Sequence, residues 1–172
     1  MTKGLILLVE DSETKKAIYK KALEDAQYTV IDAGNGEEGL KIAQTREIDI
    51  IVTDLAMPIM DGFTMIHILK HKEETRYIPI ICVSATYKDI ADKLKALLDS
   101  GAEEYFYMPD NLDELIAKVE VMMRIRKIYL EFIEKNRQLK IFNDVAIGRE
   151  LKMIELKNKI KELEAELAKY KK

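Results

Sequence analysis

Apolar residues in the first 110 positions come in short runs that alternate with longer amphipathic stretches. The runs are rich in β-branched residues and are bounded by turn residues, a pattern that predicts buried strands. The predicted strands cover residues 5–9, 29–33, 49–54, 78–85 and 104–108. The amphipathic stretches predict helices near residues 13–26, 36–46, 63–73 and 87–99. Strands and helices that alternate in this way indicate βαβ units and therefore a parallel sheet.

Five such strands within roughly 110 residues predict an α/β fold with a flavodoxin-like, doubly wound parallel sheet of strand order 2-1-3-4-5. The crossover connections of such a sheet are almost always right-handed. In this order the first and third strands are neighbours, so residues that follow them should lie side by side. Binding and catalytic groups of open α/β sheets lie at the carboxyl ends of the strands.

After Pro109 the pattern changes to one long helix. From residue 112 onward there is no proline and a single glycine, Gly148. Apolar residues repeat with a seven-residue period at two positions, a and d, and only Lys135 and Arg149 interrupt the stripe. The stripe consists of Ile125, Ile128, Phe132, Leu139, Phe142, Ala146, Met153, Leu156, Ile160, Leu163, Leu167 and Tyr170. A helix of about 60 residues, about 90 Å long, cannot bury this stripe against one domain, so it predicts a coiled coil. We expect a homodimer formed through residues 125–170.

Charge divides the chain at nearly the same place. Residues 1–123 carry 14 Lys and Arg against 23 Asp and Glu, a net charge of −9. Residues 124–172 carry 14 against 8, a net charge of +6, and the two parts sum to −3. This asymmetry argues for two functional segments, which we place at residues 1–122 and 123–172.

Composition narrows the location and the partners. The single cysteine, Cys82, cannot form an internal disulfide, which fits a reducing compartment. The apolar run at residues 5–9 is too short to span a bilayer. We therefore expect a cytoplasmic protein with no membrane partner. The basic residues of the second segment are spread along the predicted helix, and the acidic first segment would oppose DNA, so we expect no nucleic-acid partner.

Carboxylates lie at the ends of two predicted strands. Glu10 and Asp11 follow the first strand, and Asp54 ends the third. Because these strands are neighbours in the predicted order, the three acids should meet at one edge of the sheet. Adjacent carboxylates repel one another unless a cation joins them, and oxygen ligands suit Mg²⁺. The sequence therefore predicts a magnesium site, and the alternative is three solvated loop acids.

Residues 34–39, GNGEEG, match the G-x-G-x-x-G pattern of dinucleotide-binding sites. However, Glu37 and Glu38 stand where a pyrophosphate would need the positive end of a helix. The match also follows the second strand and not the first. We interpret it as a turn and a helix start, at which glutamates interact favourably with the helix dipole.

Four motifs in order make the chain similar to the CheY-like receiver domains of two-component response regulators, over residues 3 to about 122. They are LLVEDS after the first strand, DLAMPIMDGF around Asp54, VSAT after the fourth strand, and Y-x-x-x-P at residues 105–109. The resemblance implies that Asp54 accepts a phosphoryl group from the phosphohistidine of a sensor histidine kinase. It implies no enzymatic activity beyond Mg²⁺-dependent phosphorylation and dephosphorylation of the protein itself.

The resemblance also implies roles for other residues. Glu10, Asp11 and Asp54 would hold Mg²⁺ together with the backbone carbonyl of Ala56. Ser84 would donate a hydrogen bond to a phosphoryl oxygen, and Tyr105 would be an aromatic switch that moves inward with it.

One position departs from the family pattern. Receivers carry a lysine directly before the proline that follows the fifth strand, whereas this chain has Met108 before Pro109. A thioether is only a weak acceptor and cannot replace the charge. The loss of one charge-assisted hydrogen bond costs about 1.5–3 kcal/mol. Lys88, just past Ser84, is a candidate replacement.

Two functions from different classes follow. The first is a response regulator that accepts a phosphoryl group on Asp54 and signals through a dimeric coiled coil. The second is a pseudo-receiver that works without phosphorylation, as a scaffold that dimerises or docks a partner. Met108 favours the second, whereas Glu10, Asp11, Asp54 and Ser84 favour the first.

Overall fold

The computed structural model describes residues 2–84, 99–107 and 112–170. Within these ranges, strands and helices alternate as the sequence predicts. The strands are β1 (Leu5–Val9), β2 (Thr29–Ala33), β3 (Ile50–Asp54), β4 (Ile80–Ser84) and β5 (Glu104–Tyr107). The helices are α1 (Glu13–Asp25), α2 (Gly36–Thr45), α3 (Gly62–Lys70) and α5 (Leu112–Tyr170).

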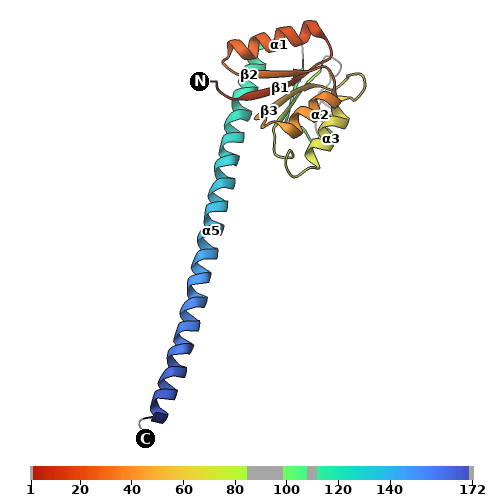
Figure 1. Cartoon of the computed structure of the whole chain (residues 1–172). Coiled ribbons are helices and arrows are strands. Elements are labelled where there is room, and N and C mark those ends of the chain that lie inside the picture. The colour runs from red at the N-terminus through yellow and green to blue at the C-terminus, as the bar shows by residue number, and fades with distance from the viewer. Residues whose placement is uncertain (1, 85–98, 108–111, 171–172) are drawn as a thin grey trace. The chain divides into compact units, whose positions relative to one another are not determined.

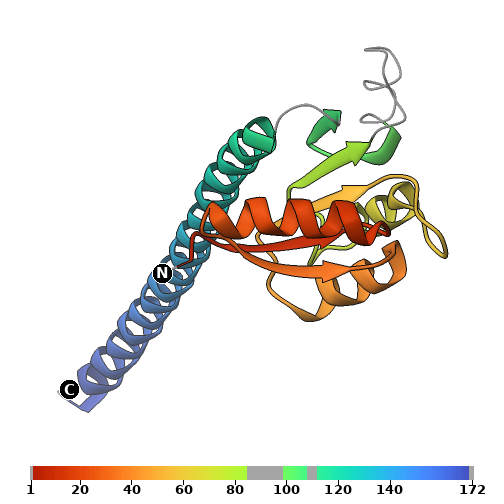
Figure 2. The ribbon, with the colours of Figure 1, turned by 90° about the horizontal axis from the view of Figure 1, so that it is seen from above.

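The five strands form one parallel sheet of order β2-β1-β3-β4-β5, which confirms the predicted fold class. In the register of this sheet, Val9 at the end of β1 pairs with Ala33 of β2 and with Thr53 of β3. The strands run in the same direction, so their carboxyl ends meet at one edge (Figure 2). The loops after β1 and β3 therefore lie next to each other.

Alternating side chains of the strands belong to two separate hydrophobic clusters, one on each face of the sheet. On β1, Leu7 and Val9 belong to the cluster that includes residues of α2 and α3, whereas Ile6 and Leu8 belong to the other. That second cluster includes residues of α1 and the first part of α5. Figure 1 shows α2 and α3 side by side and apart from α1. The near-continuous apolar runs of the sequence thus reflect strands buried on both faces.

Two boundaries differ from the prediction by two or more residues, and each difference has a local reason. β4 begins at Ile80 and not at residue 78, because Pro79 has no amide hydrogen to contribute to the ladder. α3 ends at Lys70, and a hydrogen-bonded turn follows in which the amide of Arg76 donates to the carbonyl of Lys72. Apart from its last residue, the helix predicted near 87–99 lies outside the described residues.

The chain forms two compact units, Met1–Lys127 and Ile128–Lys172. In the first unit, Leu115 and Val119 of α5 are fully buried in the second cluster. In the second unit, residues 131–166 are exposed without exception. Among the described residues, no helix is long and apolar enough to cross a membrane. The functional boundary at 122/123 stays a prediction, because compactness does not test what each segment does.

Candidate functional site

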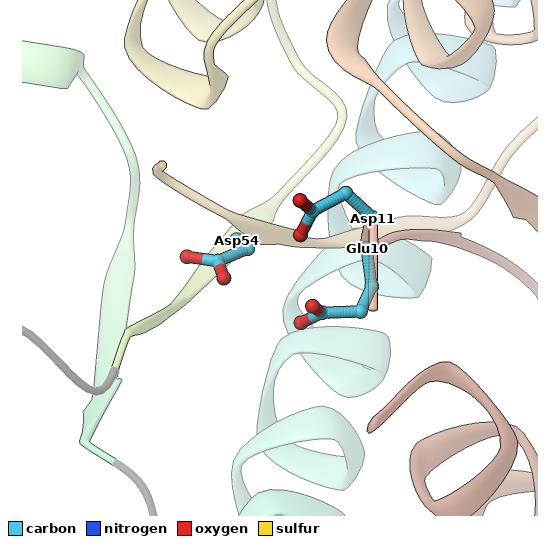
Figure 3. Close-up of side chains that lie close together, drawn as sticks. All are labelled: Glu10, Asp11 and Asp54. Atoms are coloured by element: carbon cyan, nitrogen blue, oxygen red, sulfur yellow. The ribbon is translucent and has the colours of Figure 1, made fainter. Parts of the chain in front are cut away.

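Three carboxylates meet where β1 and β3 end. One oxygen atom each from Glu10, Asp11 and Asp54 lies within 4.8 Å of the others. Figure 3 shows the carboxylates of Glu10 and Asp11, which follow β1, directed toward Asp54. Glu10 and Asp54 are buried, at 1% and 6% exposure, whereas Asp11 is exposed. The expected convergence of the three acids is therefore present, and the group is open to solvent on the side of Asp11.

The two carboxylate oxygens of Asp54 have different surroundings. Oδ1 accepts hydrogen bonds from the backbone amides of Leu55, at 2.6 Å, and Ala56, at 3.3 Å. Oδ2 lies 3.1 Å from the Nζ atom of Lys15. Backbone amides of the following loop thus fix the orientation of the carboxylate, and its Oδ2 atom faces the ammonium of Lys15.

The Asp61-Gly62 pair explains how the loop after β3 is held in place. Asp61 is the N-cap of α3, and its Oδ1 accepts a hydrogen bond of 2.7 Å from the amide of Thr64. The amide of Gly62 donates to the carbonyl of Leu55 at 3.0 Å. A Cβ atom at Gly62 would lie 2.2 Å from the backbone oxygen of Asp54, so only glycine allows this approach. The start of α3 is thereby packed directly against the backbone of the candidate phosphoacceptor.

Lys15 is a site residue that the sequence reasoning missed. Its Nζ atom donates to Glu10 Oε1 at 3.2 Å and to Asp54 Oδ2 at 3.1 Å. The signal was present, because Ser12 precedes a helix and helical Cα–Cβ bonds tilt toward the N-terminus. A lysine in the first turn of that helix is therefore directed back toward the end of β1.

Burial and nearby charges change the pKa values of Glu10 and Lys15, and both are raised. Burial is the largest influence on Glu10 and raises its pKa, and the charge of Asp54 adds to this effect. The amide of Ser12 and the ammonium of Lys15 offset only part of that rise in pKa. Partial burial lowers the pKa of Lys15, but the hydrogen bonds and charges of Asp54 and Glu10 outweigh it and raise that pKa above its ordinary value.

The GNGEEG stretch is a turn and a helix start, as predicted. Asn35 is the N-cap of α2, and its side chain accepts a hydrogen bond of 3.0 Å from the amide of Glu38. The Glu38 carboxylate in turn accepts from the amide of Gly34 at 2.9 Å. A Cβ atom at Gly39 would lie 2.9 Å from a methyl carbon of Val9, so this glycine brings α2 close to β1.

Among the remaining predicted site residues, the structure describes Ala56, Ser84 and Tyr105. Ala56 is exposed in the loop after β3, and the role of its carbonyl stays a prediction. Ser84 ends β4, and Tyr105 is the second residue of β5, so both lie on the strands that the prediction gave them. Met108 and Lys88 lie outside the described residues.

A parallel sheet of this order, with carboxylates at the ends of its first and third strands, is the arrangement that the resemblance to receiver domains implies. Residues 6–120 match the response regulator receiver domain family, which is more than half of the chain. The chain belongs to this family.

The chain is also similar to individual relatives. It is 32% identical over 119 residues to the transcriptional regulatory protein HprR of Escherichia coli, covering 69% of this chain and 51% of that protein. The DNA-binding dual master transcriptional regulator RpaA of a Synechocystis species is 34% identical over 119 residues, covering 69% and 48%. The chain thus spans about half the length of these curated relatives.

A solved structure shows the same fold. It is the signal receiver domain of a signal transduction histidine kinase from Syntrophus aciditrophicus. It is 30% identical to this chain, with a TM-score of 0.65 over 70% of this chain and 90% of that one.

The relatives overturn one expectation about partners. We expected no nucleic-acid partner, yet both relatives are transcriptional regulators, and RpaA is described as DNA-binding. The expectation was wrong because it used only the charge distribution of these 172 residues. The charge distribution bears only on direct contact between these residues and DNA. It carries no information about what a longer regulator that contains such a domain binds.

Proposed function

We propose that this chain is a phosphoryl-accepting receiver, with Asp54 as the acceptor and a sensor histidine kinase as the donor. The observation that carries the proposal is the asymmetric environment of the Asp54 carboxylate. Two backbone amides hold Oδ1, while Oδ2 is directed at the cluster with Glu10 and Lys15. Phosphoryl transfer depends mainly on positioning and on charge neutralisation, and the fixed orientation of the Asp54 carboxylate supports the first of these.

In the proposed reaction, Asp54 Oδ2 forms a bond to the phosphorus atom while the phosphorus–nitrogen bond of phosphohistidine breaks. The electron pair of that bond returns to the imidazole of the kinase. Backbone amides keep Oδ1 out of the reaction. The proposal includes no chemistry on any other substrate.

We assign the metal ligands to Glu10, Asp11, Asp54 and the backbone carbonyl of Ala56. The donor set fits Mg²⁺, because three carboxylate oxygens lie within 4.8 Å of one another and one of the residues is exposed. A bound Mg²⁺ would neutralise charge on the phosphoryl oxygens. Ser84 would donate to one of those oxygens, and Tyr105 would report the change by repacking.

The long helix is proposed to pair with a second copy of the chain. Its a and d residues are exposed in one chain, for example Phe142 at 70% and Leu139 at 60%. Burial of apolar surface stabilises by about 25 cal/mol per Å², so a stripe of this length favours association. A change at Asp54 would then reach the partner as a shift in the paired helices.

The output of the regulator is proposed to be transcription, with DNA as the partner of the whole regulator. The two transcriptional relatives support this, and the match with them covers about half of their length. The proposal concerns the regulator that this receiver controls and not direct contact between these residues and DNA.

A second candidate function is a scaffold that works without phosphorylation. Met108 favours it, because the lysine that receivers carry at that position would pair with a phosphoryl oxygen. Such a pseudo-receiver would dimerise or dock a partner by shape alone.

One experiment separates the two candidates. The full chain is incubated with Mg²⁺ and acetyl phosphate, and its intact mass is measured beside an Asp54→Asn variant. We expect a gain of one phosphoryl group that is absent from the variant. No gain in a chain that binds Mg²⁺ would favour the scaffold, and an equal gain in Asp54→Asn would move the acceptor to another residue.

A further inference from the structure

Lys15 places a permanent positive charge inside the acidic cluster. Its ammonium lies 3.2 Å from Glu10 Oε1 and 3.1 Å from Asp54 Oδ2, and so bridges two of the three carboxylates. Its side chain is 35% exposed, whereas those of Glu10 and Asp54 are 2% and 8% exposed. The lysine therefore reaches two buried acids from the solvent side.

The cluster needs a cation. Buried carboxylates that lie this close together repel one another unless a cation joins them. Lys15 is the one positive charge that the described part of the chain brings into direct contact with both acids.

We propose that Lys15 is a tethered cation that competes with the divalent metal ion for Glu10 and Asp54 and thereby sets the metal affinity of the site. The identity of the metal as Mg²⁺ rests on the proposed function. Lys15 contacts Glu10 and Asp54, and each of these residues also contributes one carboxylate oxygen to the three-acid group. A Mg²⁺ ion held by Glu10 and Asp54 at a ligand distance of about 2.0–2.1 Å would repel the nearby ammonium, so the ammonium has to withdraw before the ion can bind.

The competition predicts a specific change in metal affinity. We would titrate Mg²⁺ into the metal-free full chain by isothermal calorimetry, and compare the wild type with Lys15→Met. Without the ammonium, Mg²⁺ should bind about tenfold more tightly, which corresponds to about 1.4 kcal/mol. Lys15→Arg keeps the charge and should bind Mg²⁺ as the wild type does. Lys15→Gln, which loses the charge but keeps a donor, should again bind more tightly.

Lys20→Met is the matched control. Lys20 lies on the same helix, forms an ion pair with Asp32 and has a side chain that is 37% exposed. Its removal changes the net charge of the chain by the same amount but leaves Glu10 and Asp54 untouched. We expect its Mg²⁺ affinity to stay within about twofold of the wild type, because Lys20 pairs with Asp32 and such exposed pairs contribute only about 0–1 kcal/mol.

Thermal unfolding gives a second readout. In EDTA, Lys15→Met should melt below the wild type and below Lys20→Met, because it leaves buried carboxylates without a cation. Added Mg²⁺ should raise its melting temperature more than that of the wild type. Equal Mg²⁺ affinity of Lys15→Met and the wild type would overturn the proposal, as would an equal gain in affinity for Lys15→Met and Lys20→Met.

These measurements contain no phosphodonor, so they are independent of whether Asp54 accepts a phosphoryl group. Tighter Mg²⁺ binding by Lys15→Met supports the tethered cation even if the mass experiment shows no phosphorylation. Phosphorylation of Asp54 with unchanged Mg²⁺ affinity would overturn the role of Lys15 alone.

Discussion

The two compact units use their apolar residues in opposite ways. In the first, strand residues such as Ile51 and Val52 are fully buried against helices of the same chain. In the second, Phe142 and Leu156 are 70% and 48% exposed. A buried cluster stabilises its own unit, whereas an exposed stripe contributes stability only when another surface covers it. The first unit therefore specifies its own fold, and we expect the second to become stable through association.

Charged groups show the same contrast. Glu10 and Lys15 meet in a partly buried site, where removal of one partner leaves a buried charge. Lys152 and Glu155 form an exposed pair three residues apart on α5, with side chains 64% and 70% exposed. Exposed pairs contribute about 0–1 kcal/mol, so charge on the second unit affects solubility and pairing more than the fold.

The largest effect is expected from breaking the stripe of the second unit. Leu156→Lys puts a charge at a d position, whereas Leu151→Lys puts the same charge at an exposed position off the stripe. Each buried leucine contributes about 1.5–3 kcal/mol, and a symmetric dimer loses two of them. We expect Leu156→Lys to reduce the mass in light scattering from that of a dimer to that of a monomer. Leu151→Lys should leave the dimer intact.

The Leu151→Lys control also tests how wide the associating surface of the second unit is. Several exposed apolar residues lie off the a and d stripe, namely Leu130, Ile133, Ile141, Val145, Ile147, Leu151 and Ile154. Loss of the dimer in Leu151→Lys as well would mean that a wider apolar surface than the predicted stripe is buried on association. An unchanged dimer in Leu156→Lys would contradict the coiled-coil prediction.

The sequence predicted the carboxylates at the strand ends but not Lys15, which bridges two of them. The position of Asp54 next to Glu10 follows from the strand periodicity, which the sequence shows, and from the strand order, which the fold class implies. The contact of Lys15 depends on where α1 begins and on the path of a long flexible side chain, which periodicity does not encode. Likewise the repeat predicted the stripe around Phe142 but gave no account of residues such as Leu151. Neither pattern carries information about DNA, because both describe only this chain, which spans about half the length of the transcriptional relatives.

Glycine-to-alanine substitutions should change stability in opposite directions in the two units. Gly62→Ala places a Cβ atom 2.2 Å from the backbone oxygen of Asp54, whereas a Cβ atom at Gly148 meets nothing within 4 Å. A backbone clash of this kind is among the mechanisms that destabilise by about 3 kcal/mol or more. Gly148→Ala should instead stabilise the helix by about 1 kcal/mol. Urea unfolding followed by circular dichroism measures both free energies.

A stable Gly62→Ala protein would show that α3 can move away from the loop after β3. The intact-mass experiment on that variant would then show whether the position of Asp54 depends on this contact. A Gly148→Ala variant that loses stability would show that the second unit needs its glycine for a bend or for close packing of helices.

Helix caps give a smaller effect within the first unit. Asn35 caps α2 through a hydrogen bond to the amide of Glu38, whereas Ser12 caps α1 without a side-chain hydrogen bond. Loss of an N-cap hydrogen bond costs about 1 kcal/mol. We expect Asn35→Ala to lower the free energy of unfolding by about that amount and Ser12→Ala to change it by less than half as much. Equal losses in urea unfolding would mean that the Ser12 hydroxyl forms its cap bond in solution.

The smallest effect concerns backbone strain beside the site. Ile59 has a φ of 68° and is 78% exposed, and it lies in a tight turn in which the amide of Met60 donates to the carbonyl of Pro58. A left-handed conformation costs an L-residue about 1–2 kcal/mol, whereas glycine adds about 0.5–1 kcal/mol of unfolded-state entropy. Ile59→Gly should therefore raise the free energy of unfolding by about 0.5 kcal/mol. Gln27, with a φ of 72°, offers a matched position without β-branching, so Gln27→Gly should gain less. A loss of stability in Ile59→Gly would mean that this exposed side chain is packed in solution, and a partner surface would then be needed to explain it.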